Sequence, residues 1–583
     1  MVRHKTGPLL VAFTASLPVL FVLASAVYGL ASFSPLGSLL LVLREPGVLS
    51  PAGGPGEPFY MVFRDGTRIL VVEGFSLGAL WNSLLVAAFA AISATALAVA
   101  VSVLSYLYAS ARLVMAALLP VSMLSFPFVD AYVVKRVLSL DYGLPAFFAN
   151  MHFPVVVVPR GLAGVAFYEV LAATPYAVAI VAPYMLGVPR EEVEAAVQLG
   201  ARGATLAKLL AVLSRPAIYV SLVFTAVLAL DDVSGPLVFS DDPLARSLLS
   251  YRAYRYFVST ATGAISSQGL GYSLLMLLAS TPLILAGLLL YPRLMEQIAA
   301  AGRTRPLRQG GLREAIASAV LLGPVASLRV LSVLYAFTDE WLRSPLPRLG
   351  LEPWRSLLVH PDLLRAALNS AIYAAALAGI MLAVVVYAAW SARLEEGLAA
   401  AAQRLAYTVP ILLPGIVVAY GLYLAYAGTG SPLDPLRSPL PLLLLGYYAR
   451  RSPLLYHAAE AATRAVPASL YEAARGLGAG TVKAYAATVM PLLLPQLAAP
   501  LLYTSLSIAG EVSLSVTIGG LGGAEGFHHT APLMYLVASY MGFSGLKYAS
   551  LCAAATLASY GLTLLLTLTV LFLYLFLARK SYG

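Results

Sequence analysis

Two short stretches of this chain combine a carboxylate, two alanines and a glycine in the same order. Residues 193–200 read VEAAVQLG and residues 471–478 read YEAARGLG, so the pattern Glu-Ala-Ala-x-x-x-Gly occurs twice, 278 residues apart. That interval is close to half of the 583 residues, which indicates an internal duplication. The residues that match are Glu194, Ala195, Ala196 and Gly200 in the first copy and Glu472, Ala473, Ala474 and Gly478 in the second.

These residue types favour a short helix with a defined end, which suits the transmission of motion. Pro189 suits the first position of a helix, and Glu191, Glu192 and Glu194 follow in the first turn, where carboxylates favour the positive helix end. The glycine of each copy tolerates the left-handed conformation that ends a helix. A short helix and turn of this kind can transmit a push as a rigid body. One copy alone could be an ordinary interfacial connector, but the matched pair favours transmission.

A second pair of carboxylates stands at matching positions. Asp232 lies 16 residues after Pro216, and Glu511 lies 16 residues after Pro495. Both fall in or near apolar segments, where an ionised side chain is costly unless it faces protein or water. We expect them to line or gate a pathway through the membrane, or alternatively to cap helix ends. Arg329 is a further charge in an apolar segment and either pairs with an acidic residue or extends to the interface.

Other chemistries find little support in the sequence. A phosphate-binding loop needs G-x-x-x-x-G-K followed by Ser or Thr, and the chain has no Gly-Lys pair, so we expect no ATP site. His528 and His529 beside Glu525 lack a further ligand, so we expect no metal site. The single Cys552 excludes an intramolecular disulfide. Hydrolytic triads and metalloprotease signatures are not recognised, so we expect no enzyme activity in this chain.

The elements that position these residues are membrane-spanning helices. The chain is 60% hydrophobic and 11% charged, which is unlike a soluble protein. Apolar windows of spanning length predict about twelve transmembrane helices. They lie near 8–31, 80–108, 113–134, 164–187, 217–240 and 270–292, and near 314–337, 366–390, 404–428, 439–458, 497–520 and 548–578.

The predicted fold is an all-α polytopic membrane protein made of two six-helix repeats. Residues 1–292 form the first six-helix domain, 293–313 a cytoplasmic linker rich in Arg and Gly, and 314–583 the second six-helix domain. An even number of spans in each half makes the repeats parallel, since inverted repeats need an odd number.

Lys and Arg are more numerous on the side that holds the N-terminus, so we expect both termini in the cytoplasm of a multi-pass protein of the cell membrane. The formal net charge of +10 does not indicate nucleic-acid binding, because the basic residues occur singly or in short clusters between apolar segments and do not form a continuous basic surface. The expected environment is the lipid bilayer.

At its doubled loops the chain resembles the permease subunit of binding-protein-dependent ABC importers. The family signature is Glu-Ala-Ala, three residues, Gly, and nine residues later an apolar-x-Leu-Pro stretch. In the second copy residues 488–491 read Thr-Val-Met-Pro at that place, whereas the first copy has Val212 and Leu213 where Leu-Pro is usual. The two six-span halves are similar to the fused permeases of the ferric iron and thiamine uptake group, to which aminophosphonate systems are related.

This resemblance implies a type I importer fold and a set of partners. Each loop would dock on one of two ATP-binding-cassette subunits, which bind ATP and Mg, and an extracellular solute-binding protein would deliver the solute. The chain itself would carry no cofactor. Ferric iron is the favoured solute, with thiamine or an aminophosphonate as alternatives. A twelve-span secondary transporter with parallel repeats is the alternative class, and it would need no soluble partner.

Overall fold

The computed structural model describes residues 6–54, 56–64, 66–259, 266–300, 305–341, 347–394, 398–523, 528–541 and 546–580. The fold is 76% helical. Among these residues, eight helices are long and apolar enough to cross a membrane, or up to eleven if each bent pair of helices is one span. The prediction of an all-α polytopic membrane protein is therefore confirmed. The predicted tenth span forms a helix, Pro439–Thr463, that is not among the eleven and carries Arg450, Arg451 and Glu460.

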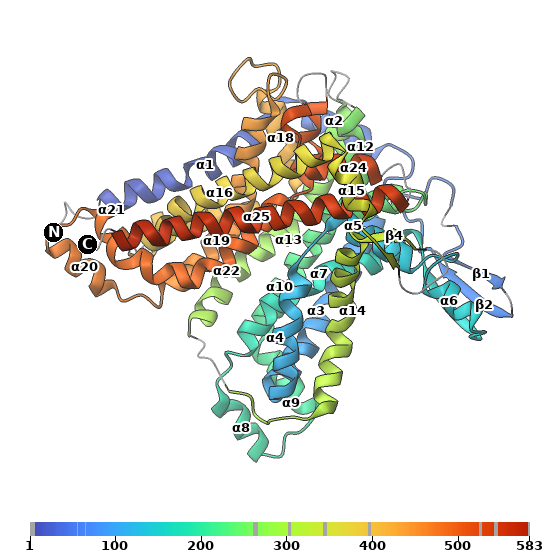
Figure 1. Ribbon diagram of the computed structural model, residues 1–583, viewed down its shortest axis with the longest axis horizontal. Coiled ribbons are helices and arrows are strands. Elements are labelled where there is room, and N and C mark those ends of the chain that lie inside the picture. The colour runs from blue at the N-terminus through green and yellow to red at the C-terminus, as the bar shows by residue number, and fades with distance from the viewer. Residues whose placement is uncertain are drawn as a thin grey trace. The chain divides into compact units, whose positions relative to one another are not determined.

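The chain divides into two compact units (Figure 1). Unit 1 comprises Met1–Pro35, Leu358–Leu536 and Ala555–Gly583, and unit 2 comprises Leu36–Leu357 and Val537–Ala554.

Unit 2 contains the helices that follow the first predicted span. They are α2 (Pro35–Leu43), α3 (Ala79–Leu107), α4 (Ala109–Met123), α5 (Pro127–Val137), α6 (Leu144–Asn150), α7 (Gly161–Met185), α8 (Arg190–Gln198), α9 (Ala204–Leu213), α10 (Arg215–Asp231), α11 (Ser234–Val238), η2 (Ala245–Ser247), α12 (Leu249–Ser259), α13 (Ser267–Ala300), α14 (Leu312–Tyr335) and α15 (Glu352–Leu358). One apolar cluster of unit 2 joins α3 and α7 to the loop that carries α8 and α9. Helix α3 has no charged residue and its apolar side chains occur on all faces, as in a helix surrounded by protein or lipid.

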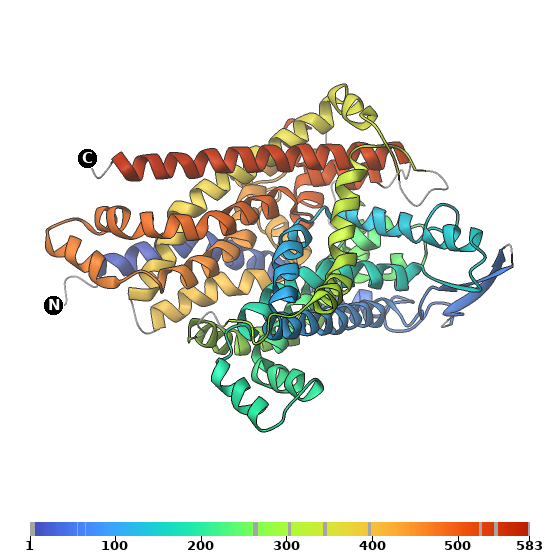
Figure 2. The same ribbon diagram turned by 60° about the horizontal axis from the view of Figure 1, so that its bottom comes forward.

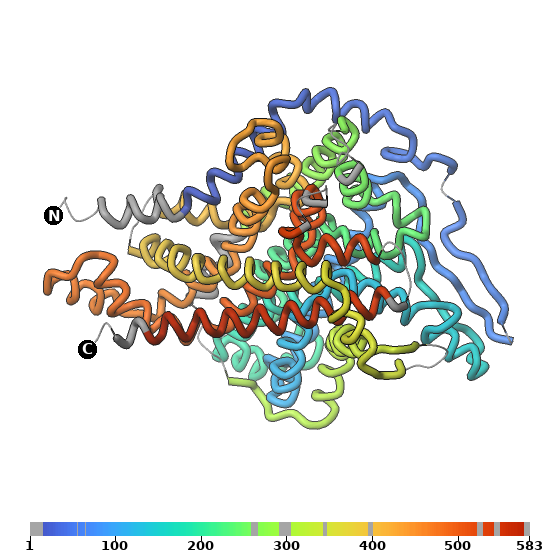
Figure 3. The backbone as a smooth tube through the Cα atoms, turned by 45° about the horizontal axis from the view of Figure 1, so that its top comes forward, coloured from blue at the N-terminus to red at the C-terminus, as the bar shows by residue number. Residues whose placement is uncertain are grey.

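Unit 1 is built from the first helix of the chain and most of the second half. Its elements are α1 (Thr6–Ser32), α16 (Pro361–Leu394), α17 (Leu398–Leu412), α18 (Gly415–Tyr426), α19 (Pro439–Thr463), α20 (Ala468–Gly476), α21 (Thr481–Ala484), the π-helical turn η4 (Tyr485–Val489), α22 (Met490–Ala509), α23 (Ser513–Val516), η5 (Gly519–Gly523) and η6 (His528–Thr530). Helices α24 (Leu533–Met541) and α25 (Leu546–Lys580) begin in one unit and end in the other. Helices α16, α19 and α22 run side by side (Figures 1 and 3).

Small β-sheets occur in the connections, and the sequence patterns did not predict them. Strands β1 (Phe59–Arg64) and β2 (Thr67–Val72) form an antiparallel hairpin, and β3 (Val155–Pro159) pairs with β2 in parallel. The hairpin projects from the helices of unit 2 (Figure 2). Strands β4 (Thr338–Glu340) and β5 (Arg348–Leu349) form a second, two-stranded sheet. Both sheets lie outside the candidate spans, so they leave the membrane fold helical.

The third span of each predicted half is broken at the same place. Helices α4 and α5 meet at 109°, and α17 and α18 meet at 105°. Pro127 begins α5 and Pro414 precedes α18, and a proline lacks the backbone N–H that would continue the preceding helix. The continuous spans predicted at 113–134 and 404–428 are therefore each two helices.

The first helix of each predicted half packs with the other half. Helix α1 packs against α16, α17, α18 and α19 within unit 1, and α14 packs against α4 and α5 within unit 2. Each unit thus combines five spans of one half with the first span of the other. The boundaries expected at residues 292 and 314 divide the chain by the order of its spans in the sequence. This division into domains stays a prediction.

A close approach between backbones holds α1 against α18. A Cβ atom added at Gly421 would lie 2.5 Å from the Ala26 carbonyl oxygen, and one added at Gly29 would lie 2.7 Å from the Ala425 nitrogen. Small residues allow such contacts between membrane helices. The hydroxyl groups of Ser25 and Tyr426 add a hydrogen bond of 2.8 Å.

The contact predicts a large effect for a single methyl group. Gly421→Ala should lower the free energy of unfolding by about 1–3 kcal/mol, because α1 must move away. Gly561→Ala is the matched control, since a Cβ at that helical glycine of α25 meets no atom within 4 Å. Denaturant unfolding in bicelles measures both variants. Equal stabilities would contradict the proposed packing.

Candidate functional site

The first Glu-Ala-Ala loop forms a short helix with a defined end. Helix α8 starts after Pro189, as predicted, and stops at Leu199. Gly200 has a φ of +91°. The backbone N–H of Gly200 donates to the Val197 carbonyl oxygen at 2.9 Å, and that of Ala201 donates to the Ala196 carbonyl oxygen at 2.9 Å. This pair of bonds is the Schellman motif, which needs a left-handed residue at the position of Gly200.

The second loop repeats this geometry. Helix α20 starts after Pro467, and Gly478 has a φ of +87°. The N–H of Gly478 donates to the Arg475 carbonyl oxygen at 3.0 Å, and that of Ala479 donates to the Ala474 carbonyl oxygen at 3.1 Å. The predicted helix and glycine stop are thus present in both copies.

Each helix is anchored by one buried side chain. Val193 of α8 is buried in the apolar cluster of α3 and α7. Tyr471 of α20 is buried and meets the ring of Trp390 from α16 edge-to-face, with centroids 5.7 Å apart. Burial raises the pKa of the Tyr471 hydroxyl, although the charge of Arg475 acts in the opposite direction, so the hydroxyl stays neutral at physiological pH. Each loop helix is therefore attached to a long helix of its own unit.

The motif residues outside the anchors point largely to solvent. Ala195 and Ala473 are exposed, and Ala196 and Ala474 are half-buried, so the two copies match at both alanine positions. Glu472 is exposed. Glu194 forms an ion pair of 2.5 Å with Arg190 one turn earlier. The two glutamates are thus close to the surface and available to a partner.

A pair of leucines completes the loops, and the sequence analysis did not single them out. Leu199 and Leu477 are each 90% exposed, immediately before the left-handed glycine. An isolated exposed leucine is ordinary, but here it recurs with the same backbone conformation, with φ and ψ of −77° and 5° at Leu199 and −78° and 6° at Leu477. The recurring Leu-Gly pair of the two motifs is the signal that could have identified them.

Asp232 and Glu511 occupy matching helix breaks near the C-terminal end of the fifth span of each half. Asp232 accepts a hydrogen bond of 2.6 Å from the Gly235 N–H at the start of α11. Glu511 accepts one of 2.9 Å from the Leu514 N–H at the start of α23. Both carboxylates therefore cap the short helix that follows, three residues ahead. Their predicted role in lining or gating a pathway stays a prediction.

The surroundings of these two carboxylates differ. Glu511 is fully buried and lies 2.8 Å from Nη1 of Arg450 and 3.7 Å from Nη2 of Arg451, both on α19. Asp232 instead has a second buried carboxyl group, Glu169 of α7, near it. Within the described ranges no cation lies within ion-pair distance of Asp232. The two carboxylates thus accept the same backbone hydrogen bond, but arginines neutralise Glu511 and a second carboxyl group lies near Asp232.

Arg329 pairs with an acidic residue and does not extend to the interface. It is 1% exposed and forms an ion pair with Asp130 of α5, which is fully buried. Asp130 also accepts hydrogen bonds from the Phe126 N–H at 2.7 Å and from the Ser332 hydroxyl at 2.6 Å. The Arg329 Nε donates to the Ser122 carbonyl oxygen at 3.2 Å. The sequence analysis did not identify Asp130, because the two residues are 199 positions apart.

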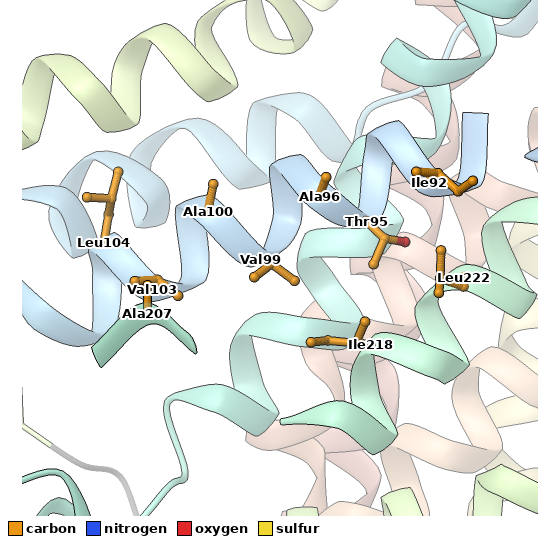
Figure 4. A pocket seen from close by; sticks show the side chains of 10 residues that line it. All are labelled: Ile92, Thr95, Ala96, Val99, Ala100, Val103, Leu104, Ala207, Ile218 and Leu222. Carbon is orange, nitrogen blue, oxygen red and sulfur yellow. The ribbon is translucent and has the colours of Figure 1, made fainter. Parts of the chain in front are cut away.

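An apolar cavity of about 680 Å³ lies between α3, α9 and α10 (Figure 4). Figure 4 shows Val99 and Thr95 of α3 facing Ile218 and Leu222 of α10. The Thr95 hydroxyl is hydrogen-bonded to Ser221 at 2.9 Å, and the other lining side chains are apolar. This cavity offers no ligand to a charged solute.

No group of three metal-ligating side chains is present in the part of the chain that the structure describes. Of the predicted histidine stretch, Glu525 lies outside the described residues. The Nδ1 atom of His529 accepts a hydrogen bond of 2.8 Å from Nη1 of Arg365.

Comparison of this chain with protein-family models, with curated proteins and with solved structures finds no match. The fold and the spans define a helical polytopic membrane protein.

Proposed function

We propose that this chain is the permease subunit of an ABC importer and forms the pathway through which a small solute crosses the membrane. The observation that carries this proposal is the pair of loop helices, α8 and α20. They share a Schellman end, a buried anchor and a 90% exposed leucine. A partner that is itself a dimer would bind two such equivalent surfaces.

The position of α20 within its unit supports this proposal. In unit 1 the C-terminal end of α25 lies at the same end of the unit as α20 (Figures 1 and 3). A cytoplasmic C-terminus and a cytoplasmic coupling helix belong on one side of the membrane. In unit 2, α7 leads from β3 to the loop that contains α8. Because α7 has 25 residues, β3 and this loop lie about 37 Å apart along the helix. The proposed arrangement has twelve spans in two parallel repeats.

The proposed mechanism is a population shift. ATP-driven closure of two cassette subunits would move α8 and α20, and with them α3, α7 and α16, to which their buried side chains attach. The pathway would then open alternately to the two sides. A ligand changes such an equilibrium only through different affinities for its states, so ATP and the loaded solute-binding protein must each prefer one arrangement.

Purification from native membranes tests the class of transporter. The expected result is co-purification of an ATP-hydrolysing subunit, with uptake in proteoliposomes that needs ATP and persists when ion gradients are collapsed by ionophores. A secondary transporter with parallel repeats would give the opposite result, uptake without any partner and its loss on addition of ionophore. That outcome would overturn the proposal.

Ferric iron is the solute that we propose first, and this choice rests on the resemblance to the ferric iron and thiamine group. Thiamine and aminophosphonates are the alternatives. The proteoliposome assay with radiolabelled iron, thiamine and an aminophosphonate distinguishes them. Competition by the unlabelled solute identifies the substrate.

A further inference from the structure

Helix α12 of unit 2 brings arginines and tyrosines together. It follows η2 and reads LSYRAYRYFVS, with Arg252 and Arg255 three positions apart. Residues at this spacing lie on the same face of a helix. Arg246 of η2 adds a third guanidinium group immediately before α12.

These arginines line a cavity of about 540 Å³. The polar side chains around it include Arg246, Arg252, Arg255, Tyr256, Tyr272 and Glu45. Three positive charges therefore face one negative charge. Within the described ranges no carboxylate lies within ion-pair distance of any of the three arginines.

Glu45, the one carboxylate among the residues that line the cavity, is hydrogen-bonded to a tyrosine. The Tyr272 hydroxyl donates to Oε2 of Glu45 at 2.7 Å and accepts from Nη1 of Arg252 at 2.7 Å. Arg252 also donates through Nη2 to the Gly47 carbonyl oxygen at 3.3 Å. The Tyr256 ring stacks on the Tyr272 ring, with centroids 5.6 Å apart. Arg252 is thus held in one orientation, while Arg246 and Arg255 are exposed.

The second half of the chain builds the corresponding helix without arginine. In α24 the residues that correspond to Arg252 and Arg255 are Leu536 and Ser539. The helix starts are equivalent, because the Leu249 N–H donates to the Ser83 hydroxyl at 2.9 Å and the Leu533 N–H donates to the Ser370 hydroxyl at 2.8 Å.

The tyrosine stack recurs as well, since Tyr540 stacks on Tyr548 with centroids 5.7 Å apart. The helix start and the aromatic stack therefore form in α24 without guanidinium groups. The helix start and the aromatic stack therefore do not account for the arginines of α12, of which Arg252 also bonds Tyr272 and Gly47.

We propose that the cavity lined by Arg246, Arg252 and Arg255 binds a phosphate-type oxyanion. Guanidinium groups present paired N–H donors that match the oxygens of phosphate, and such charge-assisted hydrogen bonds are about twice as strong as neutral ones. Tyr256 and Tyr272 supply an aromatic wall. The ligand is a soluble phosphate or the headgroup of an anionic lipid, because the chemistry of recognition is the same. This inference does not depend on the proposed importer function.

The test replaces the arginines by the residues of the second half. The full-length Arg252→Leu/Arg255→Ser protein should bind inorganic phosphate at least about tenfold more weakly than the unchanged protein in isothermal titration calorimetry. Retention of phosphatidylglycerol from mixed vesicles, measured by native mass spectrometry, is the second arm. The control is Arg348→Ser/Arg355→Leu, which removes the same charge from exposed positions of unit 2.

If the cavity variant, but not the control, binds phosphate more weakly, the ligand is a soluble phosphate. If the cavity variant, but not the control, retains less phosphatidylglycerol, the ligand is a lipid headgroup. Either result supports the proposal. Equal losses in the cavity variant and the control, or no loss in either arm, would overturn it. If the cavity variant does not fold, modification of arginines by phenylglyoxal in the unchanged protein tests the proposal instead. Phosphate or phosphatidylglycerol should then protect Arg255 and leave Arg348 reactive, and absence of protection would overturn the proposal.

Discussion

Under the proposed importer function, Gly478→Val should abolish docking of the proposed ATP-hydrolysing subunit and reduce solute uptake at least about tenfold, whereas Gly476→Val should leave both close to the unchanged protein. Gly478 has a φ of +87° and Gly476 is helical. A Cβ atom at either position meets no atom within 4 Å. The two variants thus differ in backbone strain and not in available space. Left-handed backbone costs an L-residue about 1–2 kcal/mol, and more for a β-branched side chain, and about 1.4 kcal/mol is a tenfold change.

The measurements are co-purification of the ATP-hydrolysing subunit and ATP-dependent uptake in proteoliposomes. Gly200→Val should act in the same way, since Gly200 has a φ of +91° and an equally open environment. Membrane insertion and a monodisperse elution profile should be retained in all three variants, because each change lies outside the candidate spans. If Gly478→Val docks the subunit and transports solute as Gly476→Val does, the turn has no part in coupling.

The sequence predicted local structure well where a pattern lies within one segment. The helices at both Glu-Ala-Ala loops end at the expected glycines, and the first of them starts after Pro189 as expected. Apolar windows located helices at all twelve predicted spans, because hydropathy depends on the residues of the window itself. The capping of short helices by Asp232 and Glu511 was one of the two expected roles.

Pairings between distant segments could not be predicted in this way. Hydropathy does not say which helix lies beside which, so the packing of α1 with α18 and of α14 with α4 was not anticipated. For the same reason the partner of Arg329 was left open between an acidic residue and the interface. The breaks at Pro127 and Pro414 were missed because an apolar window does not register a change of direction. The arginine cavity of α12 draws on residues from three separate segments.

Removal of Arg329 should be the most destabilising single change. Arg329→Met should lower the free energy of unfolding by about 3–5 kcal/mol, because Asp130 would be left buried without its cation. Arg313→Met, at the exposed start of the same helix, is the control and should change the free energy of unfolding by less than about 0.5 kcal/mol. Denaturant unfolding in bicelles measures both variants. Equal stability of the two would show that the ion pair contributes nothing.

The double variant Arg329→Met/Asp130→Asn should be more stable than Arg329→Met alone. Asparagine keeps one side-chain oxygen that can accept the Phe126 N–H, and its side-chain amide N–H can donate to the Ser332 hydroxyl oxygen, while the uncompensated charge is gone. The expected coupling energy of this cycle is about 0.5–3 kcal/mol. Because α14 belongs to the second half in sequence and packs on α5 of the first, the pair joins the two halves inside unit 2. Hydrogen exchange in Arg329→Met should therefore rise first in α14 and α5, since both lose the contact that holds them together.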